Sequence, residues 1–339
     1  MRDVKAKDQQ HNWVPASIWW LAASYGCAYA LFAFLTQFHN FRIGHDHSTL
    51  VGSLGLLSGA ALALTLLLPI AIAVLGRRAG PQHTGANQTD IALSGVAAAA
   101  IALSTITAFT LGGVSVVLAL LLMRGGVLIL APLVDRLHHR NIRPAARLAL
   151  GLSLLAVALP LVFKQQSQLS WLLVVTLAVY LGSYLIRLGI MNRAAKTPQQ
   201  GLRAYYCARE FLFAWYTLAV AAFLMFLWQT VGLKVSLSDA LRPHGTAFMV
   251  GISYTLVLVA GTLVYLDPRE NSFTIPLNRA ASVAGGVLGA SLAWLSGFTA
   301  RPALVDYIAA GVIFLALVAL ARDGWLQTPR YPLRDSSGE

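Results

Sequence analysis

The chain has 339 residues, of which 57% are apolar and only 11% charged, with a formal net charge of +12 and a mean hydropathy of +0.67. A soluble domain averages about 25% charged residues, so this composition excludes an ordinary soluble fold. The basic residues fall in short breaks between apolar runs, a distribution that orients membrane proteins and argues against nucleic-acid binding.

Ten apolar runs long enough to cross a bilayer follow one another along the chain. They show no alternation of polar and apolar residues, so helices are predicted rather than the strands of a barrel. No cleavage site follows the first run, which is therefore predicted to be a permanent span and not a signal peptide. The predicted fold is an all-α polytopic membrane protein with transmembrane helices at 14–38, 49–76, 90–111, 114–135, 145–163, 169–191, 209–232, 246–266, 275–297 and 303–321.

The turns and the basic residues support this count. Gly112 and Gly113 divide one long apolar stretch, and the polar run 267–271 divides another. With a cytoplasmic N-terminus, 17 of the 25 Lys and Arg residues fall on the cytoplasmic side, five on the outer side and three inside spans. We therefore expect both termini in the cytoplasm and the protein in a bacterial inner membrane.

The ten spans divide into two sets of five. An odd-numbered unit that is duplicated in tandem enters the membrane the second time with the opposite orientation, and such inverted repeats hold transported substrates near the midplane. The predicted organisation is an N-terminal tail (1–13), a first repeat (14–163), a second repeat (164–321) and a C-terminal tail (322–339). In the fourth and ninth spans, Arg124 and Arg279 are each followed by two small residues, which supports the correspondence.

Three arginines, Arg124, Arg187 and Arg279, lie inside predicted spans. A charge at the centre of a membrane helix costs at least about 2.5–3.5 kcal/mol, so such residues usually face a cavity or a partner. No carboxylate lies deep in a span, although Glu210, near a span end, could reach Arg187 or Arg209. A guanidinium group offers two-pronged hydrogen bonds to carboxylate or phosphate, and an anionic substrate is predicted. Snorkelling to the membrane surface is the competing interpretation, above all for Arg187.

Other polar and aromatic residues within the spans are candidate cavity residues. Asn278 adjoins Arg279, and Tyr180, Tyr184 and Tyr254 carry hydroxyl groups inside predicted helices. Packing against neighbouring helices is the competing interpretation for each. Gly285 and Gly289 have the four-residue spacing that allows close contact between membrane helices.

Metal, redox and enzymatic functions have little support in the sequence. His45 and His47 flank an aspartate in a short outer loop, with no further ligand nearby, so no metal site is predicted. Cys27 and Cys207 match no ligand or disulfide spacing. No phosphate-binding loop or nucleophile motif is present, so neither an enzyme nor a cofactor is predicted.

The topology and two local strings resemble the drug/metabolite transporter (DMT) superfamily, including EamA-type transporters. The strings are 123–132 (MRGGVLILAP), followed by Asp135 and Arg136, and 275–279 (IPLNR) with the small residues after it. The second string also resembles the leucine-asparagine-lysine element of nucleotide-sugar transporters, with Arg in place of Lys. Basic residues in spans four and nine resemble the phosphate clamp of triose-phosphate translocators. The resemblance implies that Arg124, Asn278 and Arg279 contact substrate.

The resulting hypothesis is an alternating-access transporter of a small organic anion, phosphorylated or carboxylated. Arg124, Arg187, Asn278, Arg279, Tyr184 and Tyr254 are the predicted substrate-binding residues. One alternative is a flippase for a lipid-linked phosphate substrate, and another is a membrane scaffold that binds a partner complex and transports nothing. The expected partners are the substrate and membrane lipids, without nucleic acid, and a homodimer is compatible with the sequence.

Overall fold

A computed structural model describes residues 18–43, 50–77, 79, 87–110, 119–127, 144–163, 171–194, 200–232, 245–267 and 271–325. Within these ranges every regular element is a helix. The helices are α2 (Ile18–Ile43), α3 (Leu50–Gly76), α4 (Gln88–Thr110), α6 (Pro144–Phe163), α7 (Trp171–Ala194), α8 (Gln200–Leu227) with its π-helical continuation η2 (Trp228–Gly232), α10 (Gly245–Tyr265), α11 (Asn271–Leu295) and α12 (Leu304–Trp325). Residues 119–127 are also helical.

Six of these helices are long and apolar enough to cross a bilayer. They are the segments Ile18–Arg42, Gly55–Gly76, Gln88–Phe109, Trp171–Arg193, Gly201–Val231 and Gly245–Tyr265. Large apolar side chains such as Leu66, Phe223 and Leu315 point out of the bundle and are more than half exposed, as lipid-facing residues are. The chain is therefore a multi-pass helical membrane protein, as the sequence predicts. The count of ten transmembrane helices stays a prediction.

The helix bounds lie within five residues of the predicted ones, with one exception. α8 begins at Gln200, nine residues before the predicted start at 209. Its first turns are polar and basic, and this lowers their hydropathy without disfavouring a helix outside the hydrocarbon core. The predicted turn at Gly112–Gly113, the sequence around His45 and His47, and the tail residues 1–13 and 326–339 lie outside the described residues.

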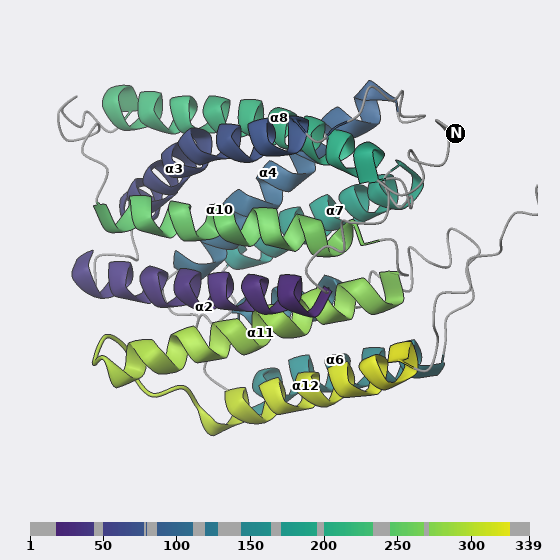
Figure 1. The fold of residues 1–339 in the computed structure, drawn as a ribbon. Helices are drawn as coiled ribbons and strands as arrows, with labels where there is room; N and C mark the ends of the chain where they lie inside the picture. The colour runs from purple at the N-terminus through teal and green to yellow at the C-terminus, as the bar shows by residue number, and fades with distance from the viewer. Residues whose placement is uncertain are drawn as a thin grey trace, which may run out of the picture.

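The helices form one bundle in which segments distant in sequence lie side by side (Figure 1). α2 packs between α10 and α11, while α3 packs on α8 and α10. α4 lies against α7 and α8, and α6 lies against α12. One end of the bundle contains the last turns of α7 and α10 and the first turns of α4, α8 and α11 (Figure 1). We call it the α7–α8 end.

Small residues allow α2 and α11 to approach closely. A Cβ atom placed on Gly285 would overlap the carbonyl oxygen of Gly26, and one placed on Gly289 would overlap the carbonyl oxygen of Ala30. The predicted close contact along the Gly285–Gly289 stripe is therefore present, with α2 as its partner.

A tryptophan compensates for the proline inside α3. Pro69 has no N–H group, so the carbonyl of Thr65, one turn earlier, receives no helical hydrogen bond from it. The indole Nε1 of Trp215 in α8 donates to that carbonyl at 2.7 Å. This bond satisfies a backbone group that hydrocarbon would leave unpaired, and it joins α3 to α8.

Candidate anion-binding site

Three buried arginines lie at the centre of the bundle. Arg124 and Arg187 are 2% exposed, and Arg279 is fully buried. They come from the helical segment 119–127, α7 and α11. None of the three reaches the surface of the bundle, so each depends on interior groups for its stabilisation.

Arg124 and Arg279 meet at a single tyrosine oxygen. The hydroxyl of Tyr180 in α7 accepts a hydrogen bond from Nη1 of Arg124 at 2.7 Å and one from Nη1 of Arg279 at 3.0 Å. These two donors occupy both lone pairs of the hydroxyl oxygen. The two guanidinium groups, one from each predicted repeat, are thus both within hydrogen-bond distance of one oxygen atom.

Aromatic rings flank the same two guanidinium groups. The Arg124 guanidinium lies 4.8 Å from the centroid of the Tyr29 ring. The Arg279 guanidinium lies 4.3 Å from the Tyr184 ring and 5.7 Å from the Tyr265 ring. Such cation–π contacts contribute about 0.5–2 kcal/mol each, which offsets part of the cost of burial but supplies no opposite charge.

Several polar atoms of this cluster have no hydrogen-bond partner among the described residues. They are Nε of Arg124, Nε and Nη2 of Arg279, Nδ2 of Asn278 and the hydroxyl oxygen of Tyr29. Asn278 uses its other polar atom, Oδ1, to accept a bond from the Tyr265 hydroxyl at 2.8 Å. Four of these five atoms are N–H donors and the fifth is a hydroxyl that can donate or accept, and leaving a buried donor unsatisfied costs about 1–3 kcal/mol. The cluster is therefore short of acceptors, which an anion would supply.

A small cavity opens beside the cluster. Its free volume is about 20 Å³, enough for one water molecule. Arg279 does not line the cavity and lies behind the rings of Tyr184 and Tyr265. The cavity lining includes Tyr25, Ile101, Arg124, Tyr184, Arg187, Tyr254, Thr262 and Tyr265. A cavity of this size cannot hold a metabolite, so the surrounding helices would have to move apart before one could bind.

Arg187 differs from the other two arginines because it has a carboxylate partner. Its Nε and Nη2 donate to Oε1 and Oε2 of Glu210, each at 2.9 Å, in a two-pronged pair. Nη2 also donates to Oγ1 of Thr262 at 2.8 Å. Both charged side chains are buried. Their opposite charges cancel, and most of their polar atoms form hydrogen bonds.

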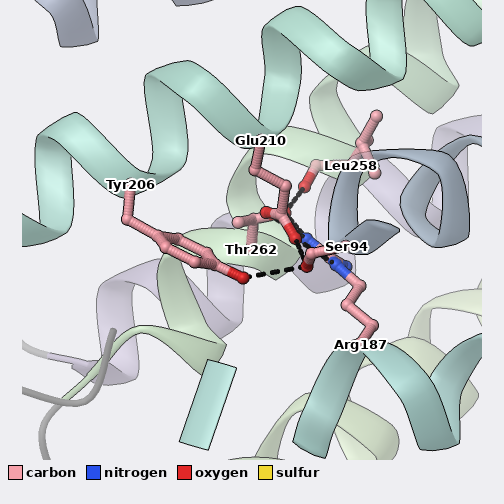
Figure 2. A network of polar contacts seen from close by, with 6 residues as sticks. All are labelled: Ser94, Arg187, Tyr206, Glu210, Leu258 and Thr262. Atoms are coloured by element: carbon pink, nitrogen blue, oxygen red, sulfur yellow. Dashed lines mark hydrogen bonds and ion pairs between the residues drawn. The ribbon is translucent and has the colours of Figure 1, made fainter. Parts of the chain in front are cut away.

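Further hydrogen bonds surround the Glu210 carboxylate on the side toward α4 and α8 (Figure 2). Ser94 in α4 donates to Oε1 at 2.5 Å, and the hydroxyl of Tyr206 donates to the Ser94 oxygen at 2.9 Å. The network therefore joins α4, α7, α8 and α10. It lies toward the α7–α8 end of the bundle.

An aromatic cluster lies on the other side of the cavity. Phe32 stacks on Phe109 with a centroid distance of 5.2 Å and contacts Tyr254 at 4.9 Å. Along α4 the order is Ser94 in the polar network, Ile101 at the cavity and Phe109 in the aromatic cluster. The cavity is thus enclosed by a polar network toward one end of the bundle and by aromatic rings toward the other.

All six predicted site residues lie in this region. Arg124, Arg187, Tyr184 and Tyr254 line the cavity, whereas Arg279 and Asn278 form the layer behind it. Among the described residues, Arg187 is the one of the three arginines that is paired with a carboxylate.

Sequence reasoning missed three tyrosines of the site, Tyr25, Tyr29 and Tyr265. A signal for two of them is present in the sequence. Tyr25 and Tyr29 are four residues apart in the first span, and Tyr180 and Tyr184 have the same spacing in the sixth. Residues four apart lie on one helix face, so a comparison of the two predicted repeats would have identified the pair.

Within the described ranges, no group of three or more His, Cys, Asp or Glu side chains is placed to hold a metal ion. No family model matches the sequence, and a search of curated proteins found no match.

Proposed function

We propose that this chain is an alternating-access carrier of a small organic anion that presents a phosphate or carboxylate group. The proposal rests above all on two buried guanidinium groups, Arg124 and Arg279, that meet at one tyrosine oxygen and retain N–H donors without a partner among the described residues. Buried donors without acceptors are costly, and an oxyanion supplies both the acceptors and the missing charge.

The packing of the helices supports the proposed inverted repeats. We number the ten helices in chain order, with 119–127 as the fourth, and replace each helix by the one five places further along. The α2–α10 contact then becomes the α7–α4 contact, and the α3–α10 contact becomes the α8–α4 contact. The α3–α8 and α6–α12 contacts map onto themselves. Gly126 lies against Leu181 of α7, which corresponds to α11 against α2. A two-fold relation between 14–163 and 164–321 would produce this pattern, as in the DMT superfamily that the sequence resembles.

The closure on both sides of the cavity supports transport by alternating access. A carrier passes through a state in which its site is shut off from both membrane faces, and the polar network on one side of the cavity and the aromatic rings on the other would supply the two barriers. Opening the polar network would expose the site at the α7–α8 end, which we propose faces the cytoplasm of a bacterial cell together with both termini. Separating the aromatic rings would expose it on the other face.

Exchange across proteoliposomes tests the function. The purified protein would be reconstituted and assayed for counterflow with mono-, di- and tricarboxylates and with phosphate monoesters. We expect saturable exchange for at least one class, and loss of it in both Arg124→Gln and Arg279→Gln. Arg193→Gln is the matched control, because Arg193 is exposed at the end of α7.

Two results would contradict the proposal. Full exchange activity in Arg124→Gln and Arg279→Gln would show that these arginines do not bind the substrate. The absence of exchange with every soluble anion would leave a lipid-linked phosphate substrate, or a scaffold without transport, as the explanation of the buried arginines.

A further inference from the structure

We propose that Glu210 sets the charge of the anion that the central site accepts, because it neutralises Arg187, the third arginine at the cavity. This inference rests on the proposed anion-binding function. That function requires a negatively charged ligand, and the inference adds how many negative charges the ligand carries. Glu210 would act as a specificity-determining residue that does not itself contact the ligand.

Arg187 is placed to contact a ligand, and Glu210 is not. Arg187 and Thr262 line the cavity together with Arg124, whereas Glu210 is fully buried behind Arg187. The hydrogen bonds of Arg187 use Nε and Nη2, and Nη1 makes none with the described residues. Nη1 is therefore the atom of Arg187 that remains available to a ligand in the cavity.

The charges of the described centre do not balance. Arg124, Arg187 and Arg279 carry three positive charges, and Glu210 is the one buried carboxylate in their network. Two positive charges remain uncompensated. In a medium of low dielectric constant the attraction between charges is several times stronger than in water, so the ligand that best fits the site carries two negative charges.

Replacing the Glu210 carboxylate by an amide of nearly the same shape would change the charge balance of the site. Gln at position 210 can still accept a hydrogen bond from Arg187, but it leaves the guanidinium charge uncompensated. The site would then carry three positive charges. We infer that its preference would move from a dianion to a trianion.

Two pairs of ligands measure this preference. Glutarate and tricarballylate share one carbon skeleton and differ by one carboxylate group. Glycerol 3-phosphate and 3-phosphoglycerate differ by the exchange of a hydroxymethyl group for a carboxylate. Binding of each ligand to the detergent-purified full-length protein would be measured by isothermal titration calorimetry. The wild type should favour the dianion of at least one pair, and Glu210→Gln should shift the ratio of dissociation constants toward the trianion by about tenfold or more.

Two further variants separate charge from hydrogen bonding. Ser94→Ala removes a hydrogen bond to the same carboxylate without changing any charge, so it should keep the wild-type preference. The double variant Arg187→Gln with Glu210→Gln returns the net charge to two and should also favour the dianion. If Glu210→Gln does not fold, Arg187→Gln serves in its place: with one uncompensated charge left, it should favour butyrate over glutarate.

The outcomes distinguish this inference from the proposed function. Binding of a dianion by the wild type with an unchanged preference in Glu210→Gln would overturn the role of Glu210 and leave the anion carrier intact. An equal shift in Ser94→Ala would also overturn it, because the effect would then come from disrupting the network. A wild type that binds none of the ligands would overturn the proposed function and this inference together.

Discussion

Tyr180 holds the guanidinium groups of Arg124 and Arg279 at one point through its hydroxyl oxygen. Neither group has a carboxylate partner among the described residues, so this oxygen and the flanking rings are their main stabilisation. At the scale of single residues, the site consists of cations that are positioned by neutral aromatic side chains. Such a site is held in shape while its charge remains available to a ligand.

The first prediction concerns that oxygen. Replacement of Tyr180 by Phe should lower the free energy of unfolding by about 1–3 kcal/mol, because two buried N–H donors lose their acceptor. Thermal unfolding in detergent would measure the loss. Tyr216→Phe is the control, since Tyr216 is half exposed on α8 and should tolerate the change. Equal melting temperatures for the two variants would show that the shared oxygen does not stabilise the cluster.

At the scale of the elements, two contacts determine how helices from different parts of the chain meet. The indole of Trp215 repairs the hydrogen-bond gap that Pro69 creates in α3. Small residues let the backbones of α2 and α11 touch. Both contacts satisfy conditions that are specific to hydrocarbon, where backbone groups have no water to bind and association depends on close packing.

The second prediction tests the repair of the proline site. Trp215→Phe keeps most of the aromatic volume but removes the donor to the Thr65 carbonyl, which should cost about 1–2 kcal/mol. Trp228→Phe, at a position that is more than half exposed in η2, should change stability little. Chemical or thermal unfolding monitored by helical circular dichroism would compare the two, and similar curves would argue against a structural role for this bond.

The third prediction tests the contact between α2 and α11. Gly285→Ala introduces a Cβ that overlaps a backbone oxygen of α2, and backbone atoms cannot move aside as flexible side chains do. We expect a loss of about 1–3 kcal/mol from overpacking. Gly311→Ala in α12, where an added Cβ meets nothing within 4 Å, should be neutral or should stabilise the helix by up to about 1 kcal/mol. The opposite order of stabilities would refute the close packing.

At the scale of the whole molecule, the contacts on the two sides of the polar centre differ in kind. Hydrogen bonds and an ion pair close the side toward the α7–α8 end, and aromatic rings close the opposite side. Opening the first side must hydrate the buried ion pair of Arg187 and Glu210, whereas separating the stacked rings exposes apolar surface. The two sides of the proposed carrier should therefore open at different energetic costs.

The fourth prediction concerns topology. An even number of spans places both termini on one face, with the end of α7 on the same face and the α11–α12 turn on the other. In a background carrying Cys27→Ala and Cys207→Ala, single cysteines would be introduced by Arg193→Cys and Arg301→Cys, both at exposed positions. A membrane-impermeant maleimide should label position 301 in intact spheroplasts and position 193 only in inverted vesicles. Labelling of both from one side would exclude the predicted topology.

The positions of the helices and the residues that are costly to bury could be predicted from the sequence alone. Hydropathy acts locally, residue by residue, so the bounds of the helices followed from composition alone to within a few residues, except where the polar start of α8 extends beyond the apolar core. The penalty for a charge in hydrocarbon is equally local, and it identified Arg124, Arg187 and Arg279 as candidate site residues before any contact was known.

Which of these groups contact one another could not be predicted from the sequence, because it depends on how the helices pack. Arg279 lies 99 residues from Tyr180 in sequence, and Ser94 lies 116 residues from Glu210, so their contacts depend on helix packing and not on local pattern. Glu210 lies near a predicted span end, where either of two arginines could reach it. In the folded bundle it pairs with Arg187. That pairing leaves Arg124 and Arg279 without an opposite charge among the described residues. Which charges compensate one another depends on the distances between the groups, and these are set by the packing of the helices.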